Sequence, residues 1–307
     1  MLKKYFLYFA FFLLLILDLL ILFYNITEKY KILVIPGITV SIISIFIAGD
    51  IFLDVSYKFG NNISISSKSV GLFIVGFASI IDELSMSIIA AFENLGSISF
   101  GAIQGSNIIT LIAFFIIIPI FYRKGIKNFR IDSYLILFTS IIIYILSLFI
   151  IKIPFYIGFI TLSIFIFYIL IINKQEANEK IIEKSDNDYS YYYGLFSVII
   201  IIIASYNMVN SAYIIADVFK INSFLSSFFL LGFFGSMPEI VMMVIAAKRN
   251  REDVSIGLIT GSTLYKETVV FSLAAFIGTL TFYNSFFSII TMIIFSVLLV
   301  IYTVLFR

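Results

Sequence analysis

Residues 76–110 read GFASIIDELSMSIIAAFENLGSISFGAIQGSNIIT, and residues 232–266 read GFFGSMPEIVMMVIAAKRNREDVSIGLITGSTLYK. Aligned without a gap at a constant offset of 156 residues, the two stretches are identical at 13 of 35 positions. The shared positions include one glutamate, Glu83 in the first copy and Glu239 in the second. Internal sequence similarity of this kind is typical of transporters built from two related halves, so we predict such halves here.

The composition is that of a membrane protein. Apolar residues make up 62% of the 307 residues, and charged residues make up 12%, about half their share in a soluble domain. The mean hydropathy is +1.13. The chain has no cysteine and no histidine, which excludes disulfides, thiol chemistry and imidazole metal sites or proton relays. Proton chemistry must therefore use carboxylates, and neither a cofactor nor a nucleic-acid partner is expected.

Polar residues divide the chain into ten apolar runs, most of them near the length of about 20 residues that spans a bilayer. The runs cover residues 5–24, 32–59, 69–93, 99–122, 131–151, 153–173, 192–219, 223–248, 254–282 and 285–306. We therefore predict an all-α polytopic membrane protein with ten transmembrane helices. The first run is too long for the core of a signal peptide and is expected to remain as a helix.

The repeated glutamates indicate where the halves meet. Glu83 lies in the third run and Glu239 in the eighth, so the chain divides into five helices plus five, residues 1–152 and 153–307. Because five is odd, the second half enters the membrane from the opposite side, and we predict inverted repeats with a substrate site at their interface. Residues 173–191, inside the second half, are predicted to form a cytoplasmic linker.

Lysine and arginine are distributed unevenly over the predicted topology. One side, which includes both chain ends and the linker, carries 15 of them, and the other side carries four. The positive-inside rule therefore predicts a multi-pass protein of the cell membrane with both termini in the cytoplasm. The sequence gives no indication of the oligomeric state.

Carboxylates inside a transmembrane run are costly, by at least about 2.5–3.5 kcal/mol at the helix centre, and usually functional. Glu83 and Glu239 are therefore candidate cation ligands. In the second copy, Gly232, Gly235 and Pro238 precede Glu239. We expect the helix to break there and its freed backbone carbonyls to become cation ligands.

Small residues begin the next helix of each copy, with the pattern GxxxGS at residues 101–106 and 257–262. Glycines four residues apart allow two helices to pack closely. The same approach would bring the hydroxyls of Ser106 and Ser262 to the site, so both roles are compatible. Carboxylates, hydroxyls and carbonyls together form a hard-oxygen set suited to Na+, Ca2+ or Mg2+.

The GSMPE motif of the second copy, followed 18 residues after its glutamate by GxxxGS, resembles the α-repeats of the cation/calcium exchanger superfamily, which includes the sodium/calcium exchangers. Its degenerate partner in the first half shares the resemblance. The resemblance implies that Glu83 and Glu239 face each other at the membrane centre and alternately bind Ca2+ or Na+. It also implies ligands from six further positions, which are the hydroxyls of Ser79, Ser106, Ser236 and Ser262 and the backbone carbonyls of Gly76 and Gly232.

Several positions differ from that family pattern, among them two in the helices that follow the glutamates. Thr110 and Lys266 follow the two serines by four residues and stand where asparagine or aspartate ligands are expected. Thr110 remains a candidate ligand through its hydroxyl. Lys266 lies one helical turn after Ser262 on the same face, so its ammonium is expected beside the glutamates as a tethered cation. The alternative is that it reaches an interface or pairs with acids away from the ions.

Two further acids adjoin these positions, Asp82 before Glu83 and Glu267 after Lys266. Neighbouring residues of a helix point about 100° apart, so two of them cannot face one ion. Asp82 and Glu267 are therefore treated as candidates for modulating the ion path.

Four functions are compatible with these features. The first is a secondary antiporter that exchanges Ca2+ for Na+ or H+. The second is a divergent exchanger of monovalent cations or protons, because two glutamates and Lys266 sum to a charge of −1. The others are a scaffold that does not transport and an intramembrane protease using Asp50, which would need two facing aspartates. Since the repeats centre on glutamates, we expect a transporter of inorganic cations in the lipid bilayer and not an enzyme.

Overall fold

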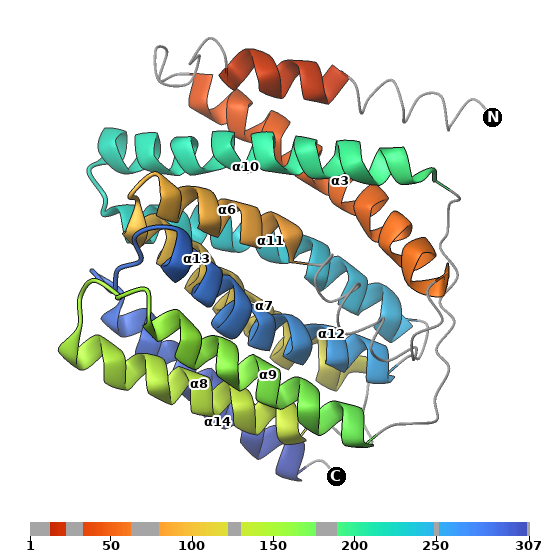
Figure 1. Cartoon of the computed structure of the whole chain (residues 1–307), viewed down its shortest axis with the longest axis vertical. Helices are drawn as coiled ribbons and strands as arrows, with labels where there is room; N and C mark the ends of the chain where they lie inside the picture. Colours follow the sequence, from red (N-terminus) through yellow and green to blue (C-terminus); the bar gives the residue numbers. More distant parts are fainter. Residues whose placement is uncertain are drawn as a thin grey trace.

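The structure is a computed structural model, and it describes residues 13–22, 33–62, 80–121, 130–175, 189–248 and 252–305. Almost all of these residues lie in helices (Figure 1). In chain order the helices are Leu13–Leu22, α3 (Val34–Asn62), α6 (Ile81–Phe92), α7 (Gly96–Phe121), α8 (Arg130–Phe149), α9 (Ile157–Gln175), α10 (Tyr191–Phe219), α11 (Ser223–Lys248), α12 (Glu252–Tyr265), the π-helix η3 (Lys266–Val270), α13 (Phe271–Ile277) and α14 (Phe286–Leu305).

Several predicted apolar runs agree closely with the observed helices. The run at 223–248 coincides with α11, and the runs at 192–219 and 285–306 differ from α10 and α14 by no more than one residue at either end. Five of the described helices, α3, α7, α8, α10 and α14, are long and apolar enough to cross a membrane. Leu13–Leu22, α9 and α11 contain shorter apolar stretches. The described part of the chain is thus a helical bundle of membrane-protein character.

The expectation that the helix breaks before Glu239 is wrong. Instead, α11 continues as α-helix through Gly232, Gly235 and Pro238 to Lys248. Proline lacks an N–H and removes one hydrogen bond from the helical ladder. Inside a transmembrane bundle that loss does not have to end the helix, because neighbouring groups can satisfy the freed carbonyl. Glu239 is therefore presented from helical backbone.

The predicted run at 254–282 is not one regular helix. α12 ends at Tyr265, five residues wind as the π-helix η3, and α13 continues directly from Phe271. Single π-turns inside α-helices are rare and are found frequently at functional sites. The first two residues of η3 are Lys266 and Glu267, and both side chains are buried. The change of winding thus coincides with two buried charges.

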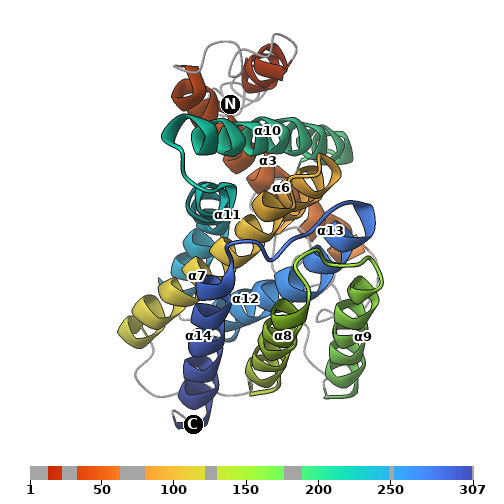
Figure 2. The same ribbon diagram turned by 90° about the vertical axis from the view of Figure 1, so that its left-hand side faces the viewer.

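The helices form three groups in the views of Figures 1 and 2. α3 and α10 pack against each other at one side of the molecule, and α8, α9 and α14 lie at the opposite side. Between these groups lie α6, α7, α11, α12 and α13. α7 packs along α11, and α6 contacts both α7 and α10. The helices that carry the two sequence repeats therefore occupy the centre of the bundle.

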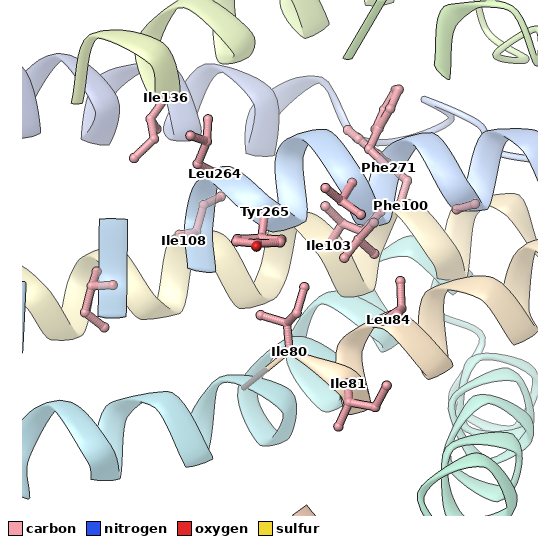
Figure 3. Close-up of a cluster of buried hydrophobic side chains, with 14 of the residues drawn as sticks. Ile80, Ile81, Leu84, Phe100, Ile103, Ile108, Ile136, Leu264, Tyr265 and Phe271 are labelled. Atoms are coloured by element: carbon pink, nitrogen blue, oxygen red, sulfur yellow. The ribbon is translucent and has the colours of Figure 1, made fainter. Parts of the chain in front are cut away.

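Apolar side chains fill the space between these central helices (Figure 3). Ile80 and Leu84 come from the start of α6, Phe100 and Ile103 from α7, and Phe271 from α13. The rings of Phe100 and Phe271 meet edge to face, with centroids 6.2 Å apart. Such packing excludes water, which strengthens the interactions of any charge placed beside it.

Backbone hydrogen bonds join several helix connections at one end of the bundle. The N–H of Ile153, between α8 and α9, donates to the carbonyl of Leu280 at 2.9 Å, beside an antiparallel bridge between Lys152 and Thr281. The N–H of Thr279 donates to the carbonyl of Ala91 in α6, also at 2.9 Å. The ends of α6, α8 and α13 therefore lie at the same side of the bundle.

Candidate cation site

Four elements present charged or hydroxyl side chains at one buried position between the two repeats. α6 contributes Glu83 from its first turn, α11 contributes Glu239, and η3 begins with Lys266. α7 contributes Ser106 and Thr110, which lie one turn apart on one face of that helix. All five side chains have 0% exposure.

Close contact between α7 and α11 makes this convergence possible. A Cβ atom added to Gly105 would lie 2.2 Å from the carbonyl oxygen of Phe228, and one added to Gly232 would lie 2.6 Å from the backbone of Gly105. The GxxxG pattern of the first copy therefore serves close helix packing. A Cβ atom added to Gly261, the counterpart of Gly105 in the second copy, would meet nothing within 4 Å. The two copies thus use the same motif differently.

Lys266 lies between the two repeated glutamates. Its Nζ is 2.7 Å from Oε2 of Glu239 and 3.6 Å from Oε1 of Glu83. A lysine buried without a counter-charge is costly, and two carboxylates facing each other repel, so the three groups stabilise one another. Lys266 therefore places its ammonium between the two carboxylates.

Hydroxyls complete this arrangement. Ser106 donates to Oε1 of Glu83 at 2.9 Å and accepts from Lys266 at 2.8 Å. Thr110 donates to Oε2 of Glu239 at 3.2 Å. Ser262 donates to the carbonyl of its own helix and also interacts with the Glu239 carboxylate. The carboxylates, three hydroxyls and the ammonium therefore belong to a single network.

Both glutamates keep one oxygen available for a further ligand. Oε2 of Glu83 and Oε1 of Glu239 are buried and have no hydrogen-bond partner in the described structure. The side-chain amides of Gln104 and Asn107, on α7 beside Ser106, also have buried oxygens without partners. Such oxygens are suited to bind a hard cation. Neither amide was predicted from the sequence as a ligand, although both are polar residues within two positions of Ser106 in an apolar run.

Asp82 lies beside the network, next to the carboxyl of Glu83. It is 4% exposed, its Oδ2 has no partner, and its charge interacts with those of Lys266 and Glu239. A small cavity next to it is also lined by Gly235. The carboxyls of Asp82 and Glu83 interact with each other, and both act on the same lysine.

Glu267 points away from the cation site. Its carboxyl hydrogen bonds to Thr139 and, at 2.9 Å, to Ser140, both on α8. Lys266 and Glu267 are adjacent in the chain but contact different neighbours, because consecutive residues of a helix point in different directions. Thr139 and Ser140 were also missed by the sequence analysis, and the only signal was a pair of hydroxyls inside an apolar run.

The remaining predicted site residues are less connected or lie outside the description. Ser236 is buried and donates to the carbonyl of Phe233 in its own helix at 2.9 Å. Gly232 packs against α7, as described above. Gly76 and Ser79 lie outside the described residues.

A model of the sodium/calcium exchanger protein family matches residues 33–173 and 189–307, which is most of the chain and includes both repeats. The chain belongs to the sodium/calcium exchanger protein family. The expected resemblance to the cation/calcium exchangers is thereby confirmed. The protein is a multi-pass membrane protein of a family of cation antiporters, and this family consists of transporters and not of enzymes.

Solved structures of two exchangers share the fold of this chain. A crystal structure of the H+/Ca2+ exchanger CAX has a TM-score of 0.69 at 14% sequence identity, covering 94% of this chain and 80% of that one. The sodium-calcium exchanger NCX_Mj has a TM-score of 0.59 at 20% identity, covering 89% of this chain and 90% of that one.

A sequence relative is an uncharacterized membrane protein of Methanocaldococcus jannaschii, 33% identical over 69 residues. That match spans only 22% of this chain and 23% of the relative. It adds a local similarity, and the family membership rests on the longer match.

Proposed function

We propose that this exchanger is a secondary cation antiporter in which a mobile cation binds between Glu83 and Glu239 in competition with Lys266. The observation that carries the proposal is the 2.7 Å contact between Lys266 Nζ and Glu239 Oε2 in a fully buried site. A mobile cation that binds the free oxygens of the two glutamates must displace this ammonium or share its ligands. Lys266 thus acts as a tethered competitor.

The charge of the site favours small monovalent cations or protons over Ca2+. Glu83, Glu239 and Lys266 sum to −1 when all are ionised, and Asp82 nearby can add one further negative charge. Ca2+ sites are built from several oxygen ligands whose combined negative charge sets the affinity. A resident ammonium removes part of that charge, so we propose exchange of Na+ or H+, with Ca2+ exchange as the alternative that family membership suggests.

Contacts between the halves are consistent with inverted repeats over most of the chain. The proposed relation between the halves matches α6 with α11 and α7 with the α12–η3–α13 segment. The contact of α7 with α11 should then have a counterpart in a contact of α6 with the α12–η3–α13 segment, and both contacts occur. α3 also contacts α10, and α8 contacts α14. Each pair consists of equivalent helices of the two halves, and equivalent helices meet when they lie near the twofold axis that relates the halves. We propose inverted halves of residues 1–152 and 153–307 on this basis.

The first helix of each half is an exception to that relation. α9 packs against α13 and η3, whereas Leu13–Leu22 is bonded to α3 and α10 through Asp18. The helix connections that are joined by backbone hydrogen bonds at one end of the bundle lie on the side with few lysines and arginines, which the positive-inside rule predicts to be extracellular. We therefore propose a cell-membrane protein with both termini and the linker at 173–191 in the cytoplasm.

Purified protein in proteoliposomes tests this function. Uptake of labelled Na+ and of Ca2+, and movement of H+, should be compared under outward gradients of each of the other ions. We expect Na+ or H+ exchange in the wild type and a shift of selectivity toward Ca2+ in Lys266→Gln. Lys248→Gln, at an exposed position at the end of α11, is the matched control and should leave selectivity unchanged.

Two results would contradict the proposal. The absence of flux of every cation by folded protein would favour a scaffold that does not transport. Preferred Ca2+ exchange in the wild type, unaltered in Lys266→Gln, would show that the lysine does not compete for the site.

A further inference from the structure

The Glu83 and Glu239 site does not by itself enforce exchange. In an exchanger, an empty site with two facing carboxylates is unfavourable, which couples the exit of one ion to the entry of another. Here Lys266 fills the site when no mobile cation is bound. Lys266 thus compensates one of the two glutamate charges from within, which weakens the coupling, and tight exchange needs a second cation elsewhere.

A second buried carboxyl with suitable surroundings lies on the other side of η3. Glu267 has 0% exposure, and hydroxyls surround it. Thr139 and Ser140 on α8 bond to its two oxygens, and Ser140 lies 3.1 Å from Ser296 on α14. Among the described residues, no lysine or arginine forms an ion pair with Glu267, in contrast to the pairing of Glu83 and Glu239 with Lys266.

The charged and titratable residues on the elements packed against η3 are mostly acids and tyrosines. They are Asp82 and Glu83 on α6, Arg130, Asp132, Tyr134 and Tyr144 on α8, Tyr168 and Lys174 on α9, and Glu252, Asp253 and Tyr265 on α12, with Tyr302 on the adjoining α14. The two cations stand at helix ends: Arg130 begins α8, about 14 Å along the helix axis before Thr139, and Lys174 is the penultimate residue of α9. The side chains that act on the Glu267 carboxyl are Thr139 and Ser140. An ionised carboxylate in such surroundings would be buried without compensation, so the group holds a proton or a metal ion.

The hydrogen bonds around Glu267 distinguish between these two occupants. The Thr139 oxygen lies within hydrogen-bond distance of Oε2 of Glu267 and of two carbonyls of its own helix, those of Leu135 at 3.0 Å and Ile136 at 2.9 Å. A hydroxyl has one hydrogen and cannot satisfy all three acceptors. A proton on Oε2 resolves the conflict, because Oε2 then donates to Thr139 and Thr139 donates to its helix.

The second oxygen of Glu267 fits the same assignment. The hydroxyl of Ser140 lies 2.9 Å from Oε1 and 2.8 Å from the carbonyl of Ile136, and it can donate to Oε1 because Thr139 then donates to its own helix. Ser296 donates to the carbonyl of Met292 at 2.7 Å. Direct contact between the carboxyl and both α8 hydroxyls leaves no space for a metal ion between them. We infer that Glu267, held by Thr139 and Ser140, is a proton-binding site whose proton is the counter-cation for the ion bound at Glu83 and Glu239. This inference rests on the proposed antiport function.

The covalent connection between the two sites provides the coupling. Lys266 and Glu267 are consecutive residues of η3, so displacement of the lysine by an incoming cation moves the backbone that carries the carboxyl. A further carboxyl lies on the helix that carries Thr139 and Ser140. Asp132, about two helical turns earlier on α8, accepts a hydrogen bond from Thr260 at 3.3 Å and is 9% exposed.

Infrared difference spectroscopy of the purified protein tests the proton site without requiring transport. We expect the carbonyl stretch of a protonated carboxylic acid in the wild type and its loss in Glu267→Gln. Thr161→Val is the matched control, because Thr161 forms a buried hydroxyl pair with Ser272 at 2.7 Å on the same helical layer. If Glu267→Gln does not fold, Thr139→Val should shift the same band by removing its hydrogen-bond acceptor.

Proteoliposomes then test the exchange. Cation-driven proton movement, followed with a pH-sensitive dye, should be lost in Glu267→Gln and kept in Thr161→Val, while binding of Na+ to Glu267→Gln remains. An infrared band that persists in Glu267→Gln, or proton movement that persists, would overturn the inference. The wild type could also carry no cation while its infrared band is lost in Glu267→Gln. In that case the proposed antiport and the exchange role of Glu267 fail, and only the proton site is supported.

Discussion

Thr110 and Lys266 occupy the same position in the two repeats, and their side chains meet. Nζ of Lys266 lies 3.5 Å from Oγ1 of Thr110, and both groups contact the same atom, Oε2 of Glu239. Ser106 bonds to Glu83 in the first half, and its counterpart Ser262 interacts with Glu239 in the second. The site is therefore built on related positions but differs in charge, with a neutral hydroxyl on one side and an ammonium on the other.

The two glutamates should respond differently to loss of charge. Lys266 is closer to Glu239, at 2.7 Å, than to Glu83, at 3.6 Å. Removing one partner of a buried ion pair costs about 3–5 kcal/mol, so Glu239→Gln should lower the free energy of unfolding by more than Glu83→Gln does. Both variants should abolish cation flux. Thermal unfolding in detergent and proteoliposome flux measure the two effects.

A second substitution provides the control for that difference. Lys266→Met in the Glu239→Gln background removes the stranded ammonium and should recover most of the lost stability. Equal destabilisation by the two single variants, or no recovery in the double variant, would show that the observed pairing does not hold the site together.

Replacing Lys266 with an acid should create a stronger divalent site. In Lys266→Asp the ammonium is exchanged for a carboxylate beside Glu83 and Glu239, which adds a hard oxygen ligand and two units of negative charge. We expect Ca2+ affinity, measured by isothermal titration, to rise tenfold or more, which corresponds to about 1.4 kcal/mol. Lys248→Asp, at the exposed end of α11, should leave the affinity unchanged. Equal Ca2+ binding by wild type and Lys266→Asp would place the lysine outside the site.

The two glycine motifs should differ in their tolerance of a methyl group. Gly105→Ala would put a Cβ 2.2 Å from the carbonyl oxygen of Phe228, whereas a Cβ at Gly261 meets nothing within 4 Å. Overpacking costs about 1–3 kcal/mol or more, so Gly105→Ala should lower the unfolding temperature and reduce flux. Gly261→Ala should be neutral or stabilise the helix by up to about 1 kcal/mol. Similar behaviour of both variants in thermal unfolding would contradict the close approach of α7 and α11.

Asp18 should anchor the helix Leu13–Leu22 without affecting cation binding. It has 0% exposure and accepts hydrogen bonds from Ser41 on α3 at 2.8 Å and from Asn207 on α10 at 3.0 Å. Asp18→Ala leaves the Asn207 amide without this acceptor, which should cost about 1–3 kcal/mol of stability. Thermal unfolding checks the cost, and isothermal titration should show unchanged Na+ affinity. A loss of affinity at wild-type stability would instead link this helix to the cation site.

The positions of most helices could be predicted from the sequence because long apolar runs have one stable arrangement in a bilayer. The run at 223–248 is an example, since it became α11 without a change of bounds. Pro238 misled the prediction because a missing N–H weakens a helix without deciding whether its neighbours keep it intact. The spacing of four residues from Ser262 was enough to expect Lys266 near the glutamates.

Other features of the site could not be read from the sequence. The preference of Lys266 for Glu239 over Glu83 depends on how α11 and η3 approach each other. The partners of Glu267 were also hidden, because hydroxyls such as Thr139 and Ser140 often bond to their own helix and give no sign of a distant acceptor. The amides of Gln104 and Asn107 became candidates only when their burial without partners was known.

The π-turn also changes how the two halves should be counted against each other. The ungapped correspondence of 156 residues holds up to Lys266, where regular α-helical winding stops. A π-turn accommodates one residue more than the α-helical turn it replaces. Under the proposed relation between the halves, structural equivalents beyond it are therefore displaced by one position, so that Phe271 corresponds to Phe114 and not to Phe115. Both Phe114 and Phe271 have 0% exposure. Applying the offset of 156 residues beyond Lys266 would thus assign Glu267 a counterpart in α7 that it does not have.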